Sequence, residues 1–234
     1  MKTIGLIGGM SWESTASYYS AINIEMKHAL GGLHSAKLIL NSVDFAEIEM
    51  LQHKGEWDKT AQILMSAAKS LQAAGADFFM IGTNTMHKVA KQIESAVAIP
   101  LLHIADATAE QLVSNGVTKV GLLGTKFTME QAFYKSRLTE KFAIDVVIPD
   151  TPQRQVVHDV IYDELCLGKI ESVSREAFVH IVEDLHAQGA QAVILGCTEI
   201  ALLINQELTE VPLYDTTEIH AKAAVQLALS DSAH

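Results

Sequence analysis

The sequence predicts an α/β protein made of two similar half-domains, each with a four-stranded parallel sheet flanked by helices. Three observations lead to this fold class. Short apolar segments alternate with longer segments of helical spacing along the 234 residues. Two of the apolar segments, 75–82 and 189–196, share a Gly-Ala start and a terminal glycine, and polar residues follow each. Other strand-like segments recur in the same order at nearly the same offset.

This repeat sets the expected domain boundaries. Thr83 and Cys197 are 114 positions apart, segments 5–8 and 121–124 are 116 apart, and segments 99–101 and 211–213 are 112 apart. Chance similarity between apolar strands is the alternative, but three matches in one order favour a duplicated unit. We expect half-domains of 1–104 plus 210–234 and of 105–209, related by a pseudo-twofold axis, with the active site in the cleft between them.

The first half begins with a buried strand and a strand-to-helix turn at Gly8-Gly9. This turn lacks the G-x-G-x-x-G spacing of a dinucleotide site. Ser11 or Ser14 could cap the helix that follows. The expected strands are 2–8, 36–45, 75–82 and 100–104, and the expected helices are 12–30, 58–74 and 86–97. The polar segment 47–57 is either a mobile loop or a short surface helix. It is either a solvated face or a flap that supplies a donor to the distal end of a substrate.

The rest of the chain repeats this alternation. The expected strands are 118–124, 144–148, 189–196 and 211–214, and the expected helices are 106–115, 129–142, 153–167, 172–188 and 216–229, with a short helix after Glu199. Strands that alternate with helices form a parallel sheet in each half. Such sheets bind ligands at the carboxyl ends of their strands, where Thr83 and Cys197 lie.

Composition indicates a globular protein and narrows its ligands. Hydrophobic residues make up 49% and charged residues 19%, which fits a folded α/β protein and excludes disorder. The formal net charge of −11 argues against nucleic-acid binding, which needs clustered Lys and Arg. We therefore expect an anionic substrate to be held by hydroxyls and helix N-termini rather than by a basic surface.

The two cysteines, Cys166 and Cys197, do not make a disulfide framework. The N-terminus enters a strand without a signal-peptide pattern, and no apolar run reaches the length of a membrane span. We expect a cytoplasmic protein with no membrane partner, in which Cys197 stays a free thiol.

Cys197 is the candidate for chemistry, because it follows Gly196 at the end of a buried strand. An inert buried cysteine is the ordinary alternative. A helix starting at Thr198 would lower the thiol pKa from about 8.5. A cysteine hydrolase would need a His partner, and the sequence fixes none near Cys197. Two groups that face each other across a repeat suit another task, the removal of a proton from one face of a carbon and its return to the other.

The residues resemble the aspartate/glutamate racemase superfamily over essentially the whole chain. The motifs are Thr3-Ile4-Gly5-Leu6-Ile7-Gly8-Gly9-Met10, Asn84-Thr85-Met86-His87 and Gly196-Cys197-Thr198-Glu199. The resemblance implies two half-domains that enclose the site, two cysteine bases acting on the α-carbon of an amino acid, no pyridoxal phosphate, no metal, and a homodimer. In this family one Cys lies in Cys-Asn-Thr and the other in Gly-Cys-Thr.

The sequence departs from the family at the first of these cysteines, where it has Thr83. A hydroxyl is a far weaker acid and base than a thiol, so we expect asymmetric catalysis. The resemblance implies that Cys197 removes the α-proton of the L-isomer, and that Thr83 or a water it holds serves the other face poorly. The nearest match is the L-aspartate/glutamate-specific racemases. The alternative is that Thr83 marks a lost activity, with the fold kept for binding.

The resemblance also implies the substrate contacts. Asn84, Thr85 and Thr198 would hold the α-carboxylate and α-amine, and Met10, Ser11 and Thr125 would close the pocket. The family's Arg and Lys for the side-chain carboxylate have no clear match, so Gln52, Lys54 or Lys169 could substitute. His87 and Asp106 are assigned structural roles.

Two further functions stay open. One is a superfamily relative, namely a maleate isomerase, decarboxylase or hydantoin racemase, which uses a Cys in a similar turn. The other is a non-catalytic protein that binds an acidic amino acid.

Overall fold

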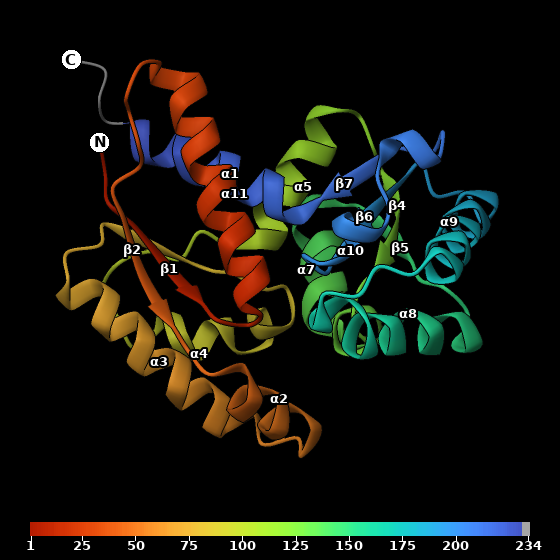
Figure 1. Cartoon of the computed structure of the whole chain (residues 1–234), viewed down its shortest axis with the longest axis horizontal. Coiled ribbons are helices and arrows are strands. Elements are labelled where there is room, and N and C mark those ends of the chain that lie inside the picture. Colours follow the sequence, from red (N-terminus) through yellow and green to blue (C-terminus); the bar gives the residue numbers. More distant parts are fainter. Residues whose placement is uncertain (231–234) are drawn as a thin grey trace. The chain divides into compact units, whose positions relative to one another are not determined.

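The first sheet is built around β1 (Ile4–Gly8), which pairs in parallel with β2 (Leu38–Ser42) on one side and β3 (Phe78–Ile81) on the other. The strand order is therefore β2-β1-β3. The computed structural model describes residues 1–230. Its chain divides into two units, Met1–Ile104 with the C-terminal segment from His220, and Ala105–Ile219 (Figure 1).

Helices cover both faces of this sheet, and the alternation of side chains along the strands explains why. Ile4 and Leu6 pack with Tyr18 and other residues of α1 (Trp12–Leu30) and α11 (Thr216–Leu229), whereas Ile7 packs with residues of α2 (Phe45–His53), α3 (Trp57–Ala73) and α4 (Ala90–Glu94). Successive residues of a strand point to opposite faces, so a strand covered on both sides must be apolar throughout. The burial of every residue of β1 and β3 follows from this.

Two helices of the first unit begin at side chains that cap them. The Ser11 side chain caps α1 by accepting the Ser14 amide at 3.2 Å, and Asp44 caps α2 in the same way. The helices are α1 (Trp12–Leu30), α2 (Phe45–His53), α3 (Trp57–Ala73), the 3₁₀ turn η1 (Thr85–Val89) and α4 (Ala90–Glu94). Segment 47–57, expected as a loop or surface helix, thus lies mostly in α2.

The second sheet has four parallel strands in the order β5-β4-β6-β7. The strands are β4 (Lys119–Leu123), β5 (Asp145–Val147), β6 (Ala192–Leu195) and β7 (Leu213–Asp215). The helices are α5 (Ile104–Ser114), α6 (Lys126–Glu130), α7 (Ala132–Phe142), α8 (Thr151–Asp163), η2 (Leu165–Leu167), α9 (Ser172–Ala187), α10 (Ile200–Leu203), η3 (Gln206–Leu208) and α11 (Thr216–Leu229).

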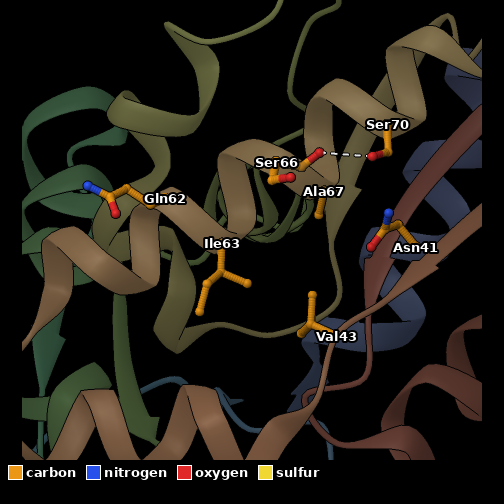
Figure 2. Close-up of a pocket in the computed structure, with 7 residues that line it drawn as sticks. All are labelled: Asn41, Val43, Gln62, Ile63, Ser66, Ala67 and Ser70. Carbon is orange, nitrogen blue, oxygen red and sulfur yellow. Dashed lines mark hydrogen bonds between the residues drawn. The ribbon is translucent and has the colours of Figure 1, made fainter.

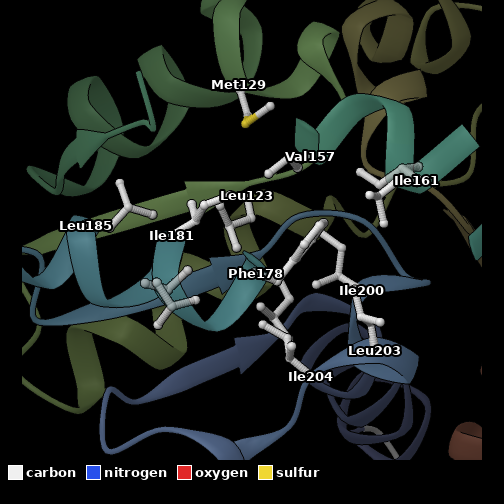
Figure 3. Close-up of a cluster of buried hydrophobic side chains, with 14 of the residues drawn as sticks. Leu123, Met129, Val157, Ile161, Phe178, Ile181, Leu185, Ile200, Leu203 and Ile204 are labelled. Carbon is white, nitrogen blue, oxygen red and sulfur yellow. The ribbon is translucent and has the colours of Figure 1, made fainter. Parts of the chain in front are cut away.

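Figure 3 shows the hydrophobic core on one face of this sheet. Leu123 of β4 and residues of β6 pack there against α8, α9 and α10, with Phe178 fully buried. Cys166 and Cys197 are half-buried and pack against the same cluster. The end of β6 is thus anchored by apolar packing immediately before its polar residues begin.

The predicted α/β class with two parallel sheets is confirmed, and three details differ. The first sheet has three strands, not four, because Leu101 makes only an isolated bridge to Phe79 before α5 begins at Ile104. The expected helix 129–142 is interrupted at Gln131, where the backbone is extended. The expected helix 86–97 starts as a 3₁₀ turn.

The last strand also belongs elsewhere than expected. The predicted first half included residues 210–219, but β7 pairs with β6 of the second sheet, with Ile194 opposite Tyr214. Strand pairing, which the sequence pattern does not specify, decides this membership. No helix among the described residues is both long enough and apolar enough to cross a membrane.

Acid is expected to destabilise the first unit through His220, which is fully buried. Burial lowers the pKa of His220 from 6.5 to about 4, so between these pH values the imidazole is protonated in the unfolded chain and neutral in the folded unit. Stability from this group is full above pH 6.5 and is lost as the pH falls towards 4, by about 3 kcal/mol in all. Urea unfolding of the wild-type protein and His220→Gln between pH 7 and 4.5 checks this. Equal pH dependence in the two proteins would contradict it.

Candidate functional site

Thr83, Asn84 and Thr85 leave the carboxyl end of β3 in a turn held on both sides. The Gly82 amide donates to the Ile7 carbonyl at 2.9 Å, and the Ser14 hydroxyl donates to the Gly82 carbonyl at 3.4 Å. Thr83 is half-buried, whereas Asn84 and Thr85 are buried. The turn therefore presents Thr83 beside the first turn of α1.

Met10 and Ser11 lie in the turn that follows β1, and both are buried. The turn needs Gly9, whose φ is +90° and where a Cβ would collide with the Val43 backbone. Met10 belongs to the same apolar cluster as Met86 of η1. The turns after β1 and β3 thus form one packed surface at the carboxyl edge of the first sheet.

Gln52 joins this group from α2. It is 3% exposed, and its side-chain amide lies 3.7 Å from the Met86 sulfur. The structure therefore brings Gln52 to η1, beside the turn that carries Asn84 and Thr85.

In the second unit, the turns after β4 and β6 touch through their backbones. The Gly196 amide donates to the Leu123 carbonyl at 2.7 Å, and a Cβ on Gly124 would lie 2.9 Å from the Gly196 carbonyl oxygen. Thr125 is buried and caps α6, accepting the Thr128 amide. Thr125, Cys197 and Thr198 consequently share the carboxyl edge of the second sheet.

A buried carboxylate lies against the candidate catalytic thiol. The Cys197 thiol donates to Glu199 Oε2 at 3.0 Å, and the Thr198 hydroxyl donates to the same oxygen at 2.7 Å. Glu199 is 3% exposed. Glu199 ends the motif Gly196-Cys197-Thr198-Glu199, and no role was predicted for it from the sequence. Its signal was a carboxylate at the end of an apolar strand, where burial without a partner would be costly.

The expected lowering of the Cys197 pKa is wrong. Burial first, and then the Glu199 carboxylate and Cys166, raise the pKa of the Cys197 thiol well above its usual value. The helix after Cys197 is α10, which has four residues and begins only at Ile200. A helix this short, which begins three residues after Cys197, does not stabilise a thiolate, and the negative charge of Glu199 disfavours one. Cys197 is therefore held as a thiol.

Glu199→Gln is expected to lower the Cys197 pKa, because it removes the negative charge beside the sulfur. The pH dependence of iodoacetamide alkylation at Cys197, followed by mass spectrometry, measures this shift. Glu207→Gln, an exposed carboxylate in η3, is the matched control and should leave the profile unchanged. An unshifted profile in Glu199→Gln would show that the carboxylate does not control the thiol.

The structure also places two charged residues that the sequence singled out. Lys169 is exposed and follows η2. Asp106 forms ion pairs with Arg137 and Lys141. Figure 2 shows a pocket of about 440 Å³ between the end of β2 and α3. It is lined by Asn41, Val43, Gln62, Ile63, Ser66, Ala67 and Ser70, none of which is a predicted site residue.

The fold and these strand ends define a class of protein, an α/β protein of two parallel sheets with a cysteine at the end of a buried strand. Comparisons with known proteins identify the family. Residues 7–224 match the family described as Asp/Glu/hydantoin racemase. The chain belongs to this family. The family is described by its racemase activity, and racemases are isomerases, so the protein is an enzyme of the isomerase class.

Three relatives show the range of similarity. A candidate Asp/Glu racemase from Yersinia pestis is 58% identical, with a TM-score of 0.91 and coverage of 98% of this chain and 100% of that one. An aspartate racemase homologue from Pyrococcus horikoshii is 37% identical, with a TM-score of 0.83 and coverage of 97% and 99%. The broad specificity amino-acid racemase RacX of Bacillus subtilis is 23% identical, over 97% of this chain and 98% of that protein.

Proposed function

We propose that this protein racemises L-aspartate or L-glutamate without a cofactor, using Cys197 and Thr83 on the two faces of the α-carbon. The observation that carries the proposal is the Cys197 thiol at the end of β6, donating to a buried Glu199 carboxylate at 3.0 Å. Membership of the Asp/Glu/hydantoin racemase family supports the reaction type.

Glu199 supplies what a thiol of raised pKa lacks. In the proposed reaction the thiol passes its proton to Glu199 Oε2, which leaves a thiolate and a neutral carboxylic acid. The thiolate then removes the α-proton of the L-isomer and becomes a thiol again. Because proton and charge only move within the pair, Cys197 can act as a base although burial disfavours an isolated thiolate.

Thr83 cannot act as a base in the way that the Cys197–Glu199 pair does, because a hydroxyl is a poor base. We propose that Thr83, or a water it holds, gives a proton to the other face of the carbanion, and that solvent then restores both groups. Removal of the α-proton from the D-isomer is slow for the same reason. The reaction is therefore asymmetric, with L-isomer exchange faster than D-isomer exchange.

The proposed substrate contacts come from both sheet edges. Met10, Ser11, Gln52, Asn84 and Thr85 are in the first unit, and Thr125 and Thr198 are in the second. Their hydroxyl, amide and backbone N–H groups suit an α-carboxylate and α-amine. Gln52 is the proposed donor to the side-chain carboxylate, because it lies beside η1; Lys169, which is exposed, is the alternative.

A deuterium experiment tests the proposal. The protein is incubated with L-aspartate or L-glutamate in D₂O, the α-proton is followed by NMR, and the isomers are separated by chiral chromatography. We expect loss of the L-isomer α-proton signal and slower formation of the D-isomer. The absence of both exchange and D-isomer would contradict the proposal. Turnover of maleate or an arylmalonate instead would indicate another reaction of the superfamily.

The same proposal includes a homodimer and a cytoplasmic location. A working thiol at Cys197 needs a reducing compartment. Light scattering of the purified protein checks the dimer.

A further inference from the structure

Four buried aromatic side chains of the first unit are linked in a way that the racemase proposal does not use. They are Tyr18 of α1, His87 of η1, His103 and His220 of α11, and none is more than 5% exposed. The His87 ring lies 4.3 Å from that of His103 and 6.2 Å from that of His220, measured between centroids. From the sequence, His87 was predicted to have a structural role, and no partner was predicted for it.

The hydrogen bonds of His87 fix which of its nitrogens carries the proton. Its Nδ1 lies 2.8 Å from the Thr83 carbonyl oxygen, which can only accept, so Nδ1 must donate. Its Nε2 faces the backbone N–H of Ile104 at 3.3 Å, which can only donate, so Nε2 must accept. Both contacts are made together only by the neutral ring protonated on Nδ1.

The same reasoning assigns His220 the opposite tautomer. Its Nε2 lies 2.9 Å from the Leu102 carbonyl oxygen and therefore donates. Its Nδ1 then accepts the Tyr18 hydroxyl at 2.9 Å. The two imidazoles thus hold the backbone on either side of His103, one at the Leu102 carbonyl and the other at the Ile104 amide.

These contacts lie where the chain changes units. Ile104 is the last residue of the first unit before Ala105, and His220 is the first residue after the chain returns. The histidine clamp, meaning His87 and His220 with the backbone of residues 102–104, therefore fixes the exit segment of the first unit. One of its bonds also reaches the Thr83 carbonyl.

We propose that His87, protonated on Nδ1, is the positioning residue of Thr83, and that it ties the Thr83 turn to the exit segment of the first unit. The peptide group is rigid, so a bond to the Thr83 carbonyl sets the plane that joins Thr83 to Asn84. That plane controls where the Thr83 hydroxyl and the Asn84 side chain lie. The catalytic part of this inference rests on the proposed racemase function.

The tautomers are tested first, in the wild-type protein and without substrate. Two-bond ¹⁵N–¹H correlation spectra distinguish imidazoles protonated on Nδ1 from those protonated on Nε2, and the signals are assigned from His87→Asn and His220→Gln. We expect Nδ1–H for His87 and Nε2–H for His220. Protonation of His87 on Nε2 would overturn the inference, whatever the protein catalyses.

Two variants of His87 then separate its two bonds. The Asn amide reaches the position of Nδ1 and can keep the bond to Thr83, whereas Gln reaches the position of Nε2 and can keep only that to Ile104. The measured quantity is the ratio of D-isomer formed to deuterium taken up by the L-isomer. The ratio reports the Thr83 face against the Cys197 face. We expect it to fall at least about tenfold in His87→Gln, since small misplacements of a reacting group are costly, and to stay near wild type in His87→Asn.

A merely structural role would lower both rates equally in both variants, and that result would overturn the inference. If the wild-type protein shows no exchange at all, the racemase proposal fails while the positioning does not. In that case the Asn84 amide signal decides, because it should shift in His87→Gln more than in His87→Asn. Equal shifts in the two variants would show that His87 does not position the turn.

Discussion

Cys197→Ala is expected to abolish racemisation and to slow α-proton exchange of the L-isomer by about 10²- to 10⁴-fold, the usual worth of a positioned acid or base. In the proposed mechanism the thiol removes the α-proton, and Glu199 Oε2, 3.0 Å from the sulfur, only accepts the proton of the thiol. Deuterium uptake into L-aspartate and L-glutamate measures the effect. Binding of the amino acid, followed by calorimetry, should persist.

Cys166→Ala is the matched control. Cys166 is the only other cysteine in the sequence, is also half-buried, and packs against the same apolar cluster as Cys197. Its loss removes a similar volume and, apart from a contribution to the raised pKa of Cys197 that ranks after burial and Glu199, no proposed chemistry, so exchange should continue. Full exchange in Cys197→Ala would remove the basis of the mechanism. Binding without exchange in the wild-type protein would favour the non-catalytic alternative.

Thr83→Cys is expected to raise exchange of the D-isomer by about 10²-fold or more. The change replaces a hydroxyl by a thiol at the carboxyl end of β3, in a turn that the Ser14 and Ile7 contacts hold independently of the side chain at 83. A thiol titrates near pH 8.5, so part of it is already a thiolate at mildly alkaline pH. Chiral chromatography starting from the D-isomer in D₂O gives the rate.

Ser95→Cys controls for adding a thiol anywhere in the first unit, because Ser95 is an exposed residue that ends α4. It should leave D-isomer exchange at the wild-type rate. Unchanged D-isomer exchange in Thr83→Cys would mean that the oxygen at this position does not limit the reaction, and the asymmetric mechanism would have to be abandoned.

The duplicated pattern predicted much of the fold. Segments 75–82 and 189–196 became β3 and β6, each lying next to the first strand of its sheet, in the orders β2-β1-β3 and β5-β4-β6. An uncharged apolar run that ends in glycine is enough to predict a buried parallel strand. Segment 100–104 was also predicted as a strand from its apolar residues. Pro100 lacks an amide donor, however, and only Leu101 forms a bridge.

The electrostatics of the candidate site were predicted less well. The sequence placed Cys197 at a strand end correctly, yet suggested a helix that would favour a thiolate. The direction of the pKa shift depends on burial and on the Glu199 carboxylate, which folds back onto a residue two positions earlier. Side-chain orientation over so short a span is not visible in a residue pattern.

By itself the sequence determined the α/β class with two parallel sheets, the strand ends that carry Thr83 and Cys197, and the family resemblance, because these depend on local periodicity and on motifs. Only the tertiary structure decided that β7 joins the second sheet, that Glu199 holds the Cys197 thiol protonated, and that His87 bonds the Thr83 carbonyl. Each of these depends on which groups meet after the chain has packed. Strand pairing, burial and the direction of a hydrogen bond are properties of that packing and have no periodic signal in the sequence.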